Sequence, residues 1–304
     1  MVKISGFIIT ALPAVLFLCG TAAAVVALLV WSRRVRHRKN PLTVTLLRAP
    51  GHSMQIQLED LNWDIGALMF LLGFAPVMVG FIHLAESYLA GMPETVTRAV
   101  VNLIAMVGLT AYLIRQLLAK VAKRADLRLG YDAERATGQE LQRLAPRGYR
   151  IYHDIPAAGF NIDHVVVGPT GVYAVETKGR SKRHDQPGQD SSKVTYDGEA
   201  LRFPGWIESN PIRQAKDNAA WLANELCRAV GESVKVKPVL SICGWYVQRE
   251  SKSPPIVYNG KNPEAVFPKI VVQPLTDQTI ERICYQLEQW VGDVEPAAYR
   301  QTPN

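Results

Sequence analysis

Cysteine is scarce in this chain, with only four residues among 304, and no two of them form a CxxC pair. They lie far apart, at Cys19, Cys227, Cys243 and Cys284. This scarcity argues against a disulfide-stabilised scaffold and against a zinc ribbon, and it favours a reducing compartment. Charged residues are also few, at 20%, whereas hydrophobic residues reach 48%. Such a composition excludes wholly disordered, collagen-like and low-complexity chains.

The first apolar run contains no charged residue between Ile4 and Trp31. About 20 predominantly apolar residues suffice to cross a bilayer as a helix. A cleaved signal peptide is the competing interpretation, but its apolar core spans only about 7–15 residues. A lipoprotein cleavage site also fits poorly, because Leu18 rather than a small residue precedes Cys19. We therefore predict that residues 1–40 form an uncleaved membrane helix and its basic flank.

Two further apolar runs extend over Ile65–Ala85 and Ala99–Ile114. Clusters of Lys and Arg follow the first and third runs, at residues 33–39 and 115–128. Such clusters mark cytoplasmic flanks. Three crossings of a bacterial-type inner membrane therefore place the N-terminus outside the cell and everything after residue 115 in the cytoplasm. The third run has only 16 residues, so a half-buried segment is the alternative to a full span.

From about Leu129 the pattern changes to that of a soluble α/β domain. Helical periodicity ended by Pro or Gly predicts helices, and β-branched runs between turn residues predict strands. The predicted helices are 133–145, 210–229 and 277–291, and the predicted strands are 149–155, 162–167, 172–178, 193–196, 199–203, 234–243 and 266–273. The predicted organisation is a first membrane helix and flank (1–40), a cytoplasmic insert with some strand alternation (41–64), membrane helices two and three (65–115), a basic linker (116–128), the α/β domain (129–294) and a frayed tail (295–304).

The register of the central hairpin brings three charged side chains together. If residues 168–171 form its loop, Asp163 lies directly opposite Glu176. Opposed residues of an antiparallel pair share one face of the sheet, and Lys178, two positions further along, shares that face. A slip of one residue would destroy this convergence.

Two opposed carboxylates repel each other unless something neutralises them. A divalent cation would do so, and Mg²⁺ typically takes one or two carboxylates together with substrate phosphate. Lys178 beside such an ion would orient a water molecule or stabilise charge developing on a phosphate. The alternative is purely structural: Lys178 bridges Asp163 and Glu176 at a strand edge, and geometry alone leaves that alternative open.

The sequence of this hairpin also resembles that of a known protein family. The block NIDHVVVGP at Asn161–Pro169, followed by GVYAVETK at Gly171–Lys178, closely resembles the nuclease-related domain, or NERD, a family related to the PD-(D/E)xK nucleases. The resemblance covers roughly residues 129–250. It implies a restriction-endonuclease-like mixed-sheet core with a helix, a β-meander, a second helix and further strands. The expected fold class is thus α/β, with N-terminal transmembrane helices preceding that core.

The resemblance also implies roles for residues outside the hairpin. The family's Gly-x-x-Gly-Glu pattern fits Gly130–Glu134, with Ala133 in place of the second glycine, so Glu134 would be an additional acid facing the metal. Its Asn-Pro-x-x-Gln pattern fits Asn210–Gln214, so Gln214 would point toward the metal or a phosphate. Without the family, Glu134 is a first-turn helix acid and Gln214 an exposed helical residue. His164 alternates with Asp163 and is expected to face away from the carboxylates.

Basic residues after the hairpin, Arg180, Lys182 and Arg183, are candidates to hold a nucleic-acid backbone. The sequence therefore predicts a membrane-anchored, cytoplasm-facing nuclease that uses Mg²⁺ or Mn²⁺ and acts on DNA rather than RNA. A catalytically inactive module that binds nucleic acid or a partner at the membrane is the alternative, because a fold does not by itself imply an activity. A third interpretation makes the helices a sensor or an assembly anchor.

Overall fold

The structure, a computed structural model, describes residues 20–21, 23–24, 26–28, 30–31, 45–88, 95–182 and 192–294. Most of the predicted first membrane helix and the predicted tail from Glu295 lie outside these residues. The chain divides into two compact units. The first comprises Met1–Thr43, Asp60–Arg124 and Pro296–Asn304, and the second comprises Val44–Glu59 and Ala125–Glu295.

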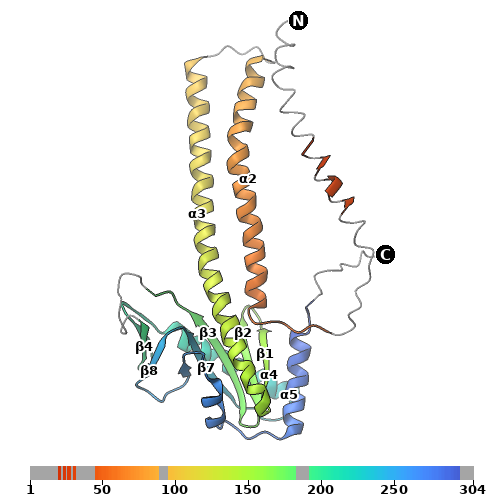
Figure 1. The fold of residues 1–304 in the computed structure, drawn as a ribbon, viewed down its shortest axis with the longest axis vertical. Coiled ribbons are helices and arrows are strands. Elements are labelled where there is room, and N and C mark those ends of the chain that lie inside the picture. Colours follow the sequence, from red (N-terminus) through yellow and green to blue (C-terminus); the bar gives the residue numbers. More distant parts are fainter. Residues whose placement is uncertain are drawn as a thin grey trace. The chain divides into compact units, whose positions relative to one another are not determined.

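The first unit contains most of two long helices, α2 (His52–Tyr88) and α3 (Val96–Leu141). Within this unit they run antiparallel, side by side (Figure 1). Each carries an apolar stretch long enough to cross a membrane, and these stretches are almost unburied, at 0% and 6%. By length and composition, the two helices suit membrane insertion.

Polar contacts tie the two helices together at both ends of their apolar stretches. At one end Arg98 pairs with Glu86 at 3.0 Å. At the other end Lys120 pairs with Asp64 at 2.6 Å, and Arg124 Nε donates a hydrogen bond to the side-chain oxygen of Asn62. Charged and polar groups at the two ends of an apolar helix pair match the two surfaces of a bilayer.

The strand pattern predicted for part of this region is wrong, and the predicted linker has a conformation that the sequence did not specify. Residues 52–64 of the predicted insert are not a strand, because they belong to α2, which begins at His52. Leu58 and Leu61, three positions apart, are the buried residues of that stretch, which is the spacing of a helix face. The predicted linker 116–128 is also helical, as the middle of α3. Its Leu, Ala, Lys and Arg residues are strong helix formers.

The second unit is built on two β-sheets. One has the order β1-β2-β3-β7-β9, antiparallel from β1 to β3 and parallel from β3 to β9, and the other has the order β6-β5-β4-β8. The strands are β1 (Arg150–Pro156), β2 (Asn161–Gly168), β3 (Gly171–Gly179), β4 (Lys193–Tyr196), β5 (Leu201–Phe203), β6 (Trp206–Glu208), β7 (Val236–Cys243), β8 (Tyr246–Arg249) and β9 (Ile256–Tyr258).

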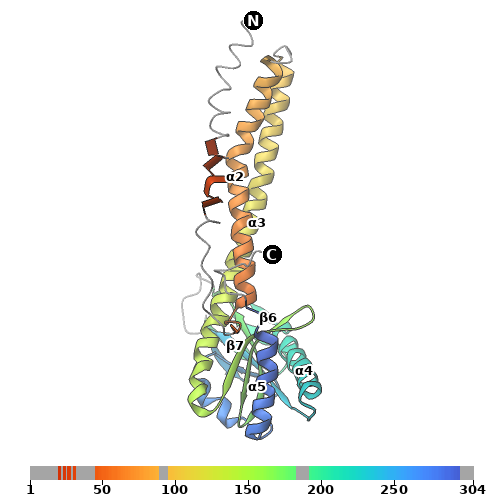
Figure 2. The same ribbon diagram turned by 90° about the vertical axis from the view of Figure 1, so that its right-hand side faces the viewer.

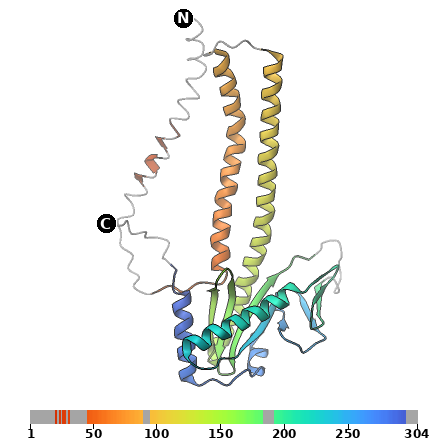
Figure 3. The same ribbon diagram turned by 180° about the vertical axis from the view of Figure 1, so that it is seen from behind.

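Helices cover both faces of the five-stranded sheet. On one face lie α4 (Asn210–Val230) and α5 (Asp277–Val291) (Figures 2 and 3). Their buried residues, such as Leu222 and Leu287, form one core with alternate residues of β1 to β3. The end of α3 and the following 3₁₀ turn, Gln142–Arg147, close the opposite face. The predicted α/β class, with long helices preceding mixed sheets and further helices, is confirmed.

The predicted strand 266–273 is wrong, because this segment contains a 3₁₀ turn at Phe267–Lys269. Pro268 has no backbone N–H to give to a strand ladder, and Phe267 is buried against the sheet instead. The three strands β6, β8 and β9 were missed, since each is only three or four residues long. Strands β1 to β3 and helices α4 and α5 lie within two residues of their predicted bounds.

Candidate functional site

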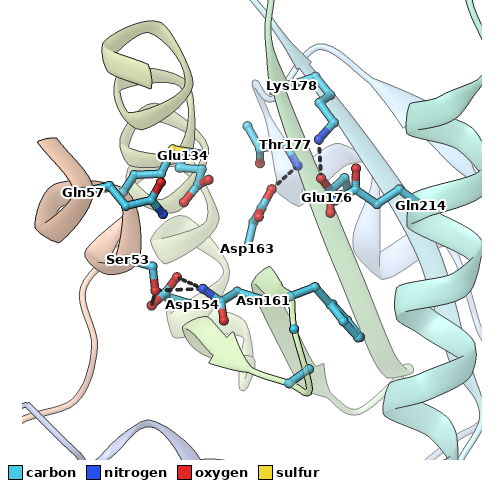
Figure 4. A pocket seen from close by; sticks show the side chains of 14 residues that line it. Ser53, Gln57, Glu134, Asp154, Asn161, Asp163, Glu176, Thr177, Lys178 and Gln214 are labelled. Carbon is cyan, nitrogen blue, oxygen red and sulfur yellow. Dashed lines mark hydrogen bonds and ion pairs between the residues drawn. The ribbon is translucent and has the colours of Figure 1, made fainter. Parts of the chain in front are cut away.

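The central hairpin has the predicted register. Gly168 pairs with Gly171, so the loop is two residues rather than four, and the pairs continue to His164 opposite Val175. One step beyond that last pair, Asp163 faces Glu176, as predicted. The ladder ends there, because the backbone N–H of Thr177 turns to the Asp163 carboxyl and donates a hydrogen bond of 2.6 Å to Oδ2 (Figure 4).

The neighbouring strand adds an acid that the sequence analysis missed. On β1, His153 pairs with His164 and Ile155 pairs with Ile162, so Asp154 lies at the position opposite Asp163. Asp154 leaves the ladder with a φ of +52°, a left-handed conformation that is uncommon for residues other than glycine. The sequence does contain a pattern that could have predicted this. The dipeptides His153-Asp154 and Asp163-His164 have reversed order, so an antiparallel pairing of the two strands places Asp154 opposite Asp163. Three adjacent strands therefore each present one acid at the same level.

A further acid, Glu134, comes from α3 and is only 3% exposed. These groups line a cavity of about 450 Å³. Its lining residues are Ser53, Met54, Gln57, Glu134, Asp154, Ala157, Gly159, Phe160, Asn161, Asp163, Glu176, Thr177, Lys178 and Gln214. The structure thus brings together five of the residues predicted from the sequence: Glu134, Asp163, Glu176, Lys178 and Gln214.

Glu176 is held by two side chains, one charged and one neutral. Lys178 Nζ donates to its Oε1 at 2.6 Å, and the amide of Asn218 donates to its Oε2 at 2.8 Å. Asn218 was also missed, although it lies four residues after Gln214 and therefore on the same side of α4. The Lys178 side chain stays 20% exposed while Glu176 is 2% exposed. The ammonium group therefore borders the cavity and the carboxylate lies beneath it.

Crowding and burial raise the pKa of the carboxyl groups. Burial is the largest cause for Asp163, whose pKa is raised further by the charges of Glu176 and Glu134. Burial, followed by the charges of Asp154 and Glu176, raises the pKa of Glu134 to about 8. Burial also raises the pKa of Glu176, with Lys178 opposing it. A cation within the cavity would relieve this repulsion.

The donor atoms of the cavity suit a hard divalent cation, because the acids offer only oxygen. Within the described residues, no group of three or more His, Cys, Asp or Glu side chains is arranged to hold a metal ion. Mg²⁺ does not require such a group, since it usually keeps several waters and takes one or two carboxylates plus substrate phosphates. The facing carboxyls of Asp163 and Glu176 fit that mode of binding.

The predicted basic contacts lie elsewhere. Arg180 makes a two-pronged ion pair with Glu208, with donor–acceptor distances of 2.9–3.1 Å. Lys182 Nζ lies 5.6 Å from the ring centre of Trp245. Neither residue lines the cavity. Arg183 lies outside the described residues.

His164 lies on the other side of the sheet from Asp163, as its alternation predicts. It is fully buried, and its Nδ1 lies 2.9 Å from Nδ1 of His153. Burial lowers the pKa of His153 to about 4, and burial together with His153 lowers the pKa of His164. The two histidines are therefore neutral packing residues.

Comparison with protein families gives one match to this region. Residues 129–243 match the nuclease-related domain, NERD. The match agrees with the resemblance seen in the sequence block of the central hairpin. It contains all of the acids of the cavity together with Lys178, Gln214 and Asn218, and it ends with β7. Searches of curated proteins and of solved structures found no match to the chain.

The cavity of the NERD region also has a wall outside the matched residues. Ser53, Met54 and Gln57 line it, and they precede the NERD match by more than 70 residues of sequence. No sequence motif pointed to these residues.

Proposed function

We propose that the chain is a membrane-anchored nuclease whose NERD region hydrolyses phosphodiester bonds of DNA with the help of Mg²⁺ or Mn²⁺. The observation that carries this proposal is the meeting of Asp163, Glu176 and Lys178 at one cavity. The pKa values of Asp163 and Glu176 are raised. Two buried carboxylates destabilise the folded state unless a cation offsets their charge.

Asp163 and Glu176 would hold the ion, with Glu134 completing its surroundings. When bound, the ion supplies Lewis-acid polarisation of a phosphoryl oxygen and lowers the pKa of a coordinated water. Asn218 keeps the Glu176 carboxylate in one orientation through its 2.8 Å hydrogen bond. Each carboxylate oxygen has more than one lone pair, so Glu176 can accept these hydrogen bonds and still face a cation.

Lys178 would act at the reacting phosphate. Its partly exposed ammonium group borders the cavity, where it would position the attacking water or stabilise the charge that develops on the phosphate. Gln214, on the α4 side of the same cavity, would donate to a phosphate oxygen. We assign Arg180, Lys182 and Arg183 only outer contacts to the nucleic-acid backbone, because Arg180 is engaged by Glu208 and Lys182 by Trp245.

The anchor of the proposed enzyme is its set of apolar helices. The apolar stretches of α2 and α3 are almost unburied, and Lys and Arg follow both the first and the third apolar run of the sequence. By the preference of basic residues for the inner side, the NERD region would face the cytoplasm from an inner membrane. The contribution of the first run, Ile4–Trp31, rests on its sequence.

One observation favours a second candidate function. Lys178 is paired with Glu176 on the same strand, which is also what a purely structural ion pair looks like. A catalytically inactive module that binds nucleic acid or a partner at the membrane would have this arrangement. The two candidates differ in whether divalent ions cause loss of substrate.

The test uses the full-length chain in detergent or nanodiscs. It is incubated with supercoiled plasmid, single-stranded DNA and RNA in the presence of Mg²⁺, Mn²⁺ or EDTA, beside its Lys178→Ala and Asp163→Asn variants. We expect divalent-dependent cleavage of DNA by the parent chain and a loss of at least about 100-fold in each variant. Binding without cleavage by the parent would favour the inactive module. Cleavage by the variants at the parent's rate would contradict the assigned roles.

A further inference from the structure

The segment Thr45–Glu59 lies outside the NERD match, yet it belongs to the same compact unit as that match. It enters the domain beside α5. Leu46 forms an isolated antiparallel bridge with Val294, and the backbone N–H of Arg48 donates to the carbonyl of Val291 at 3.1 Å. The segment then continues as the first turns of α2, which begins at His52.

Arg48 fixes this segment to the acids of the cavity. Its Nη1 pairs with Asp154 Oδ2 at 3.0 Å, and its Nε donates to Asp293 at 2.7 Å. Pro50 packs directly on α3, where a Cβ built on Gly138 would meet the Pro50 ring at 2.6 Å. These contacts define where the following helical turns lie.

Ser53 joins the segment to the same acid. Its hydroxyl donates to Asp154 Oδ2 at 2.6 Å, and the amide of Asn161 donates both to Ser53 Oγ at 2.7 Å and to Asp154 Oδ1 at 3.3 Å. Asp154 thus has an arginine, a hydroxyl and an amide as partners. Its charge is balanced by the protein itself, so Asp154 belongs to the wall that holds the segment and not to the acids that need a cation.

Gln57 is the residue that this anchoring presents to the cavity. It follows Ser53 by four positions, so the two side chains share one side of the helix. Gln57 and Glu134 both line the cavity, and Figure 4 shows Gln57 across the carboxyl cluster from Gln214. Gln57 is exposed and lines the cavity. Its amide offers two N–H donors without adding charge, which suits it to a phosphate oxygen that must approach a cluster of acids.

We propose that Thr45–Glu59 completes the substrate site, with Gln57 contacting the nucleic-acid backbone opposite Gln214 and with Arg48 and Ser53 as positioning residues. The substrate class in this inference rests on the proposed function above. One consequence is that a fragment starting after residue 59 would lack a wall of its own site.

The test compares Gln57→Ala with Gln55→Ala in the full-length chain. Gln55 is exposed on the same helical turn, and its amide bonds Glu59. Residues two apart on a helix lie about 200° apart around its axis, so Gln55 is a matched control that points away from the cavity. Cleavage is followed as a function of DNA concentration. DNA binding is measured separately in a Lys178→Ala background, so that substrate persists.

We expect Gln57→Ala to raise KM and to weaken DNA binding by roughly tenfold, the effect of one hydrogen bond to a charged group, with the melting temperature and the Mn²⁺ affinity unchanged. Gln55→Ala should behave as the parent. Equal cleavage and equal binding by the two variants would overturn the inference. If the parent binds DNA without cleaving it and Gln57→Ala still weakens binding, the nuclease proposal fails while the substrate contact stands. A parent chain that neither cleaves nor binds DNA would overturn both.

Discussion

Two opposed acids on neighbouring strands, Asp154 and Asp163, line the same cavity, and the protein surrounds them with different partners. Asp154 receives an ion pair from Arg48 and hydrogen bonds from Ser53 and Asn161. Asp163, one strand further, receives a hydrogen bond from the backbone N–H of Thr177; burial and the charges of Glu176 and Glu134 raise its pKa, and the charge of Lys178 opposes them.

The chain therefore offsets the charge of Asp154 with its own side chains, whereas the proposed function assigns the crowded acid Asp163 to a divalent cation. Asp154 is held by residues of the segment Thr45–Glu59 and by its own hairpin, and this fixes a wall. Asp163 and Glu176 lie at the open cavity beside the ammonium of Lys178, where a divalent ion and a phosphate can reach them. The wall and the proposed reacting centre are thus neighbours on one sheet, and their acids have different electrostatic surroundings.

The largest expected effect comes from removing Arg48, the positively charged side chain of the wall. Arg48→Ala leaves the buried Asp154 carboxylate without its charge partner, and breaking a buried ion pair in this way costs about 3–5 kcal/mol in the free energy of unfolding. Arg282→Ala is the control, because Arg282 pairs with Glu232 on the surface and such pairs contribute about 1 kcal/mol or less. Chemical unfolding of the detergent-solubilised chain measures both. Equal stability losses would remove the distinction between the two acids.

The two acids should respond with opposite signs to the same substitution. Asp154→Asn removes one of the two carboxylates that pair with Arg48, so it should lower the free energy of unfolding by about 1–3 kcal/mol. Asp163→Asn removes a source of repulsion in metal-free protein, so at pH 8 in EDTA it should raise that free energy. The measurement is the unfolding midpoint of each variant in EDTA. Stabilisation by Asp154→Asn, or destabilisation by Asp163→Asn as large as that of Asp154→Asn, would contradict this account.

A third comparison uses the dependence of stability on pH. The pKa of Glu134 in the folded protein is raised from 4.5 to about 8, and those of Asp163 and Glu176 are raised too. The folded state then binds more protons than the unfolded state, so this contribution is complete below about pH 4.5 and is lost as pH rises toward 8. The slope is about 1.4 kcal/mol per pH unit for each proton. Glu134→Gln should flatten the decline measured in EDTA; an unchanged decline would contradict the raised pKa.

Much of the reacting centre could be predicted from sequence because its register is set locally. A Gly-Pro-Thr-Gly turn between two β-branched runs determines which residues face each other, and that register is the one found. Glu134 and Gln214 came only from the family resemblance, since nothing in a helix sequence tells which residue meets a distant sheet. Both line the cavity.

The wall could not be predicted, because it depends on contacts between distant parts of the chain. Arg48 meets Asp154 and Asp293 across 106 and 245 positions of sequence, and no local pattern encodes such pairs. The stretch before residue 65 alternates polar and apolar residues over a short run, which is typical of a strand, whereas the structure has a helix there. The same limit applies to Arg180, whose partner Glu208 lies on a three-residue strand that was not foreseen.

The most direct test of the account is Mn²⁺ binding by the full-length chain, followed by electron paramagnetic resonance at pH 8 without nucleic acid. We predict that the parent and Gln57→Ala bind the ion, and that Asp163→Asn loses this binding although its fold is retained. Equal Mn²⁺ binding by the parent and Asp163→Asn, or no binding by the parent at all, would contradict the claim that Asp163 and Glu176 bind a divalent cation.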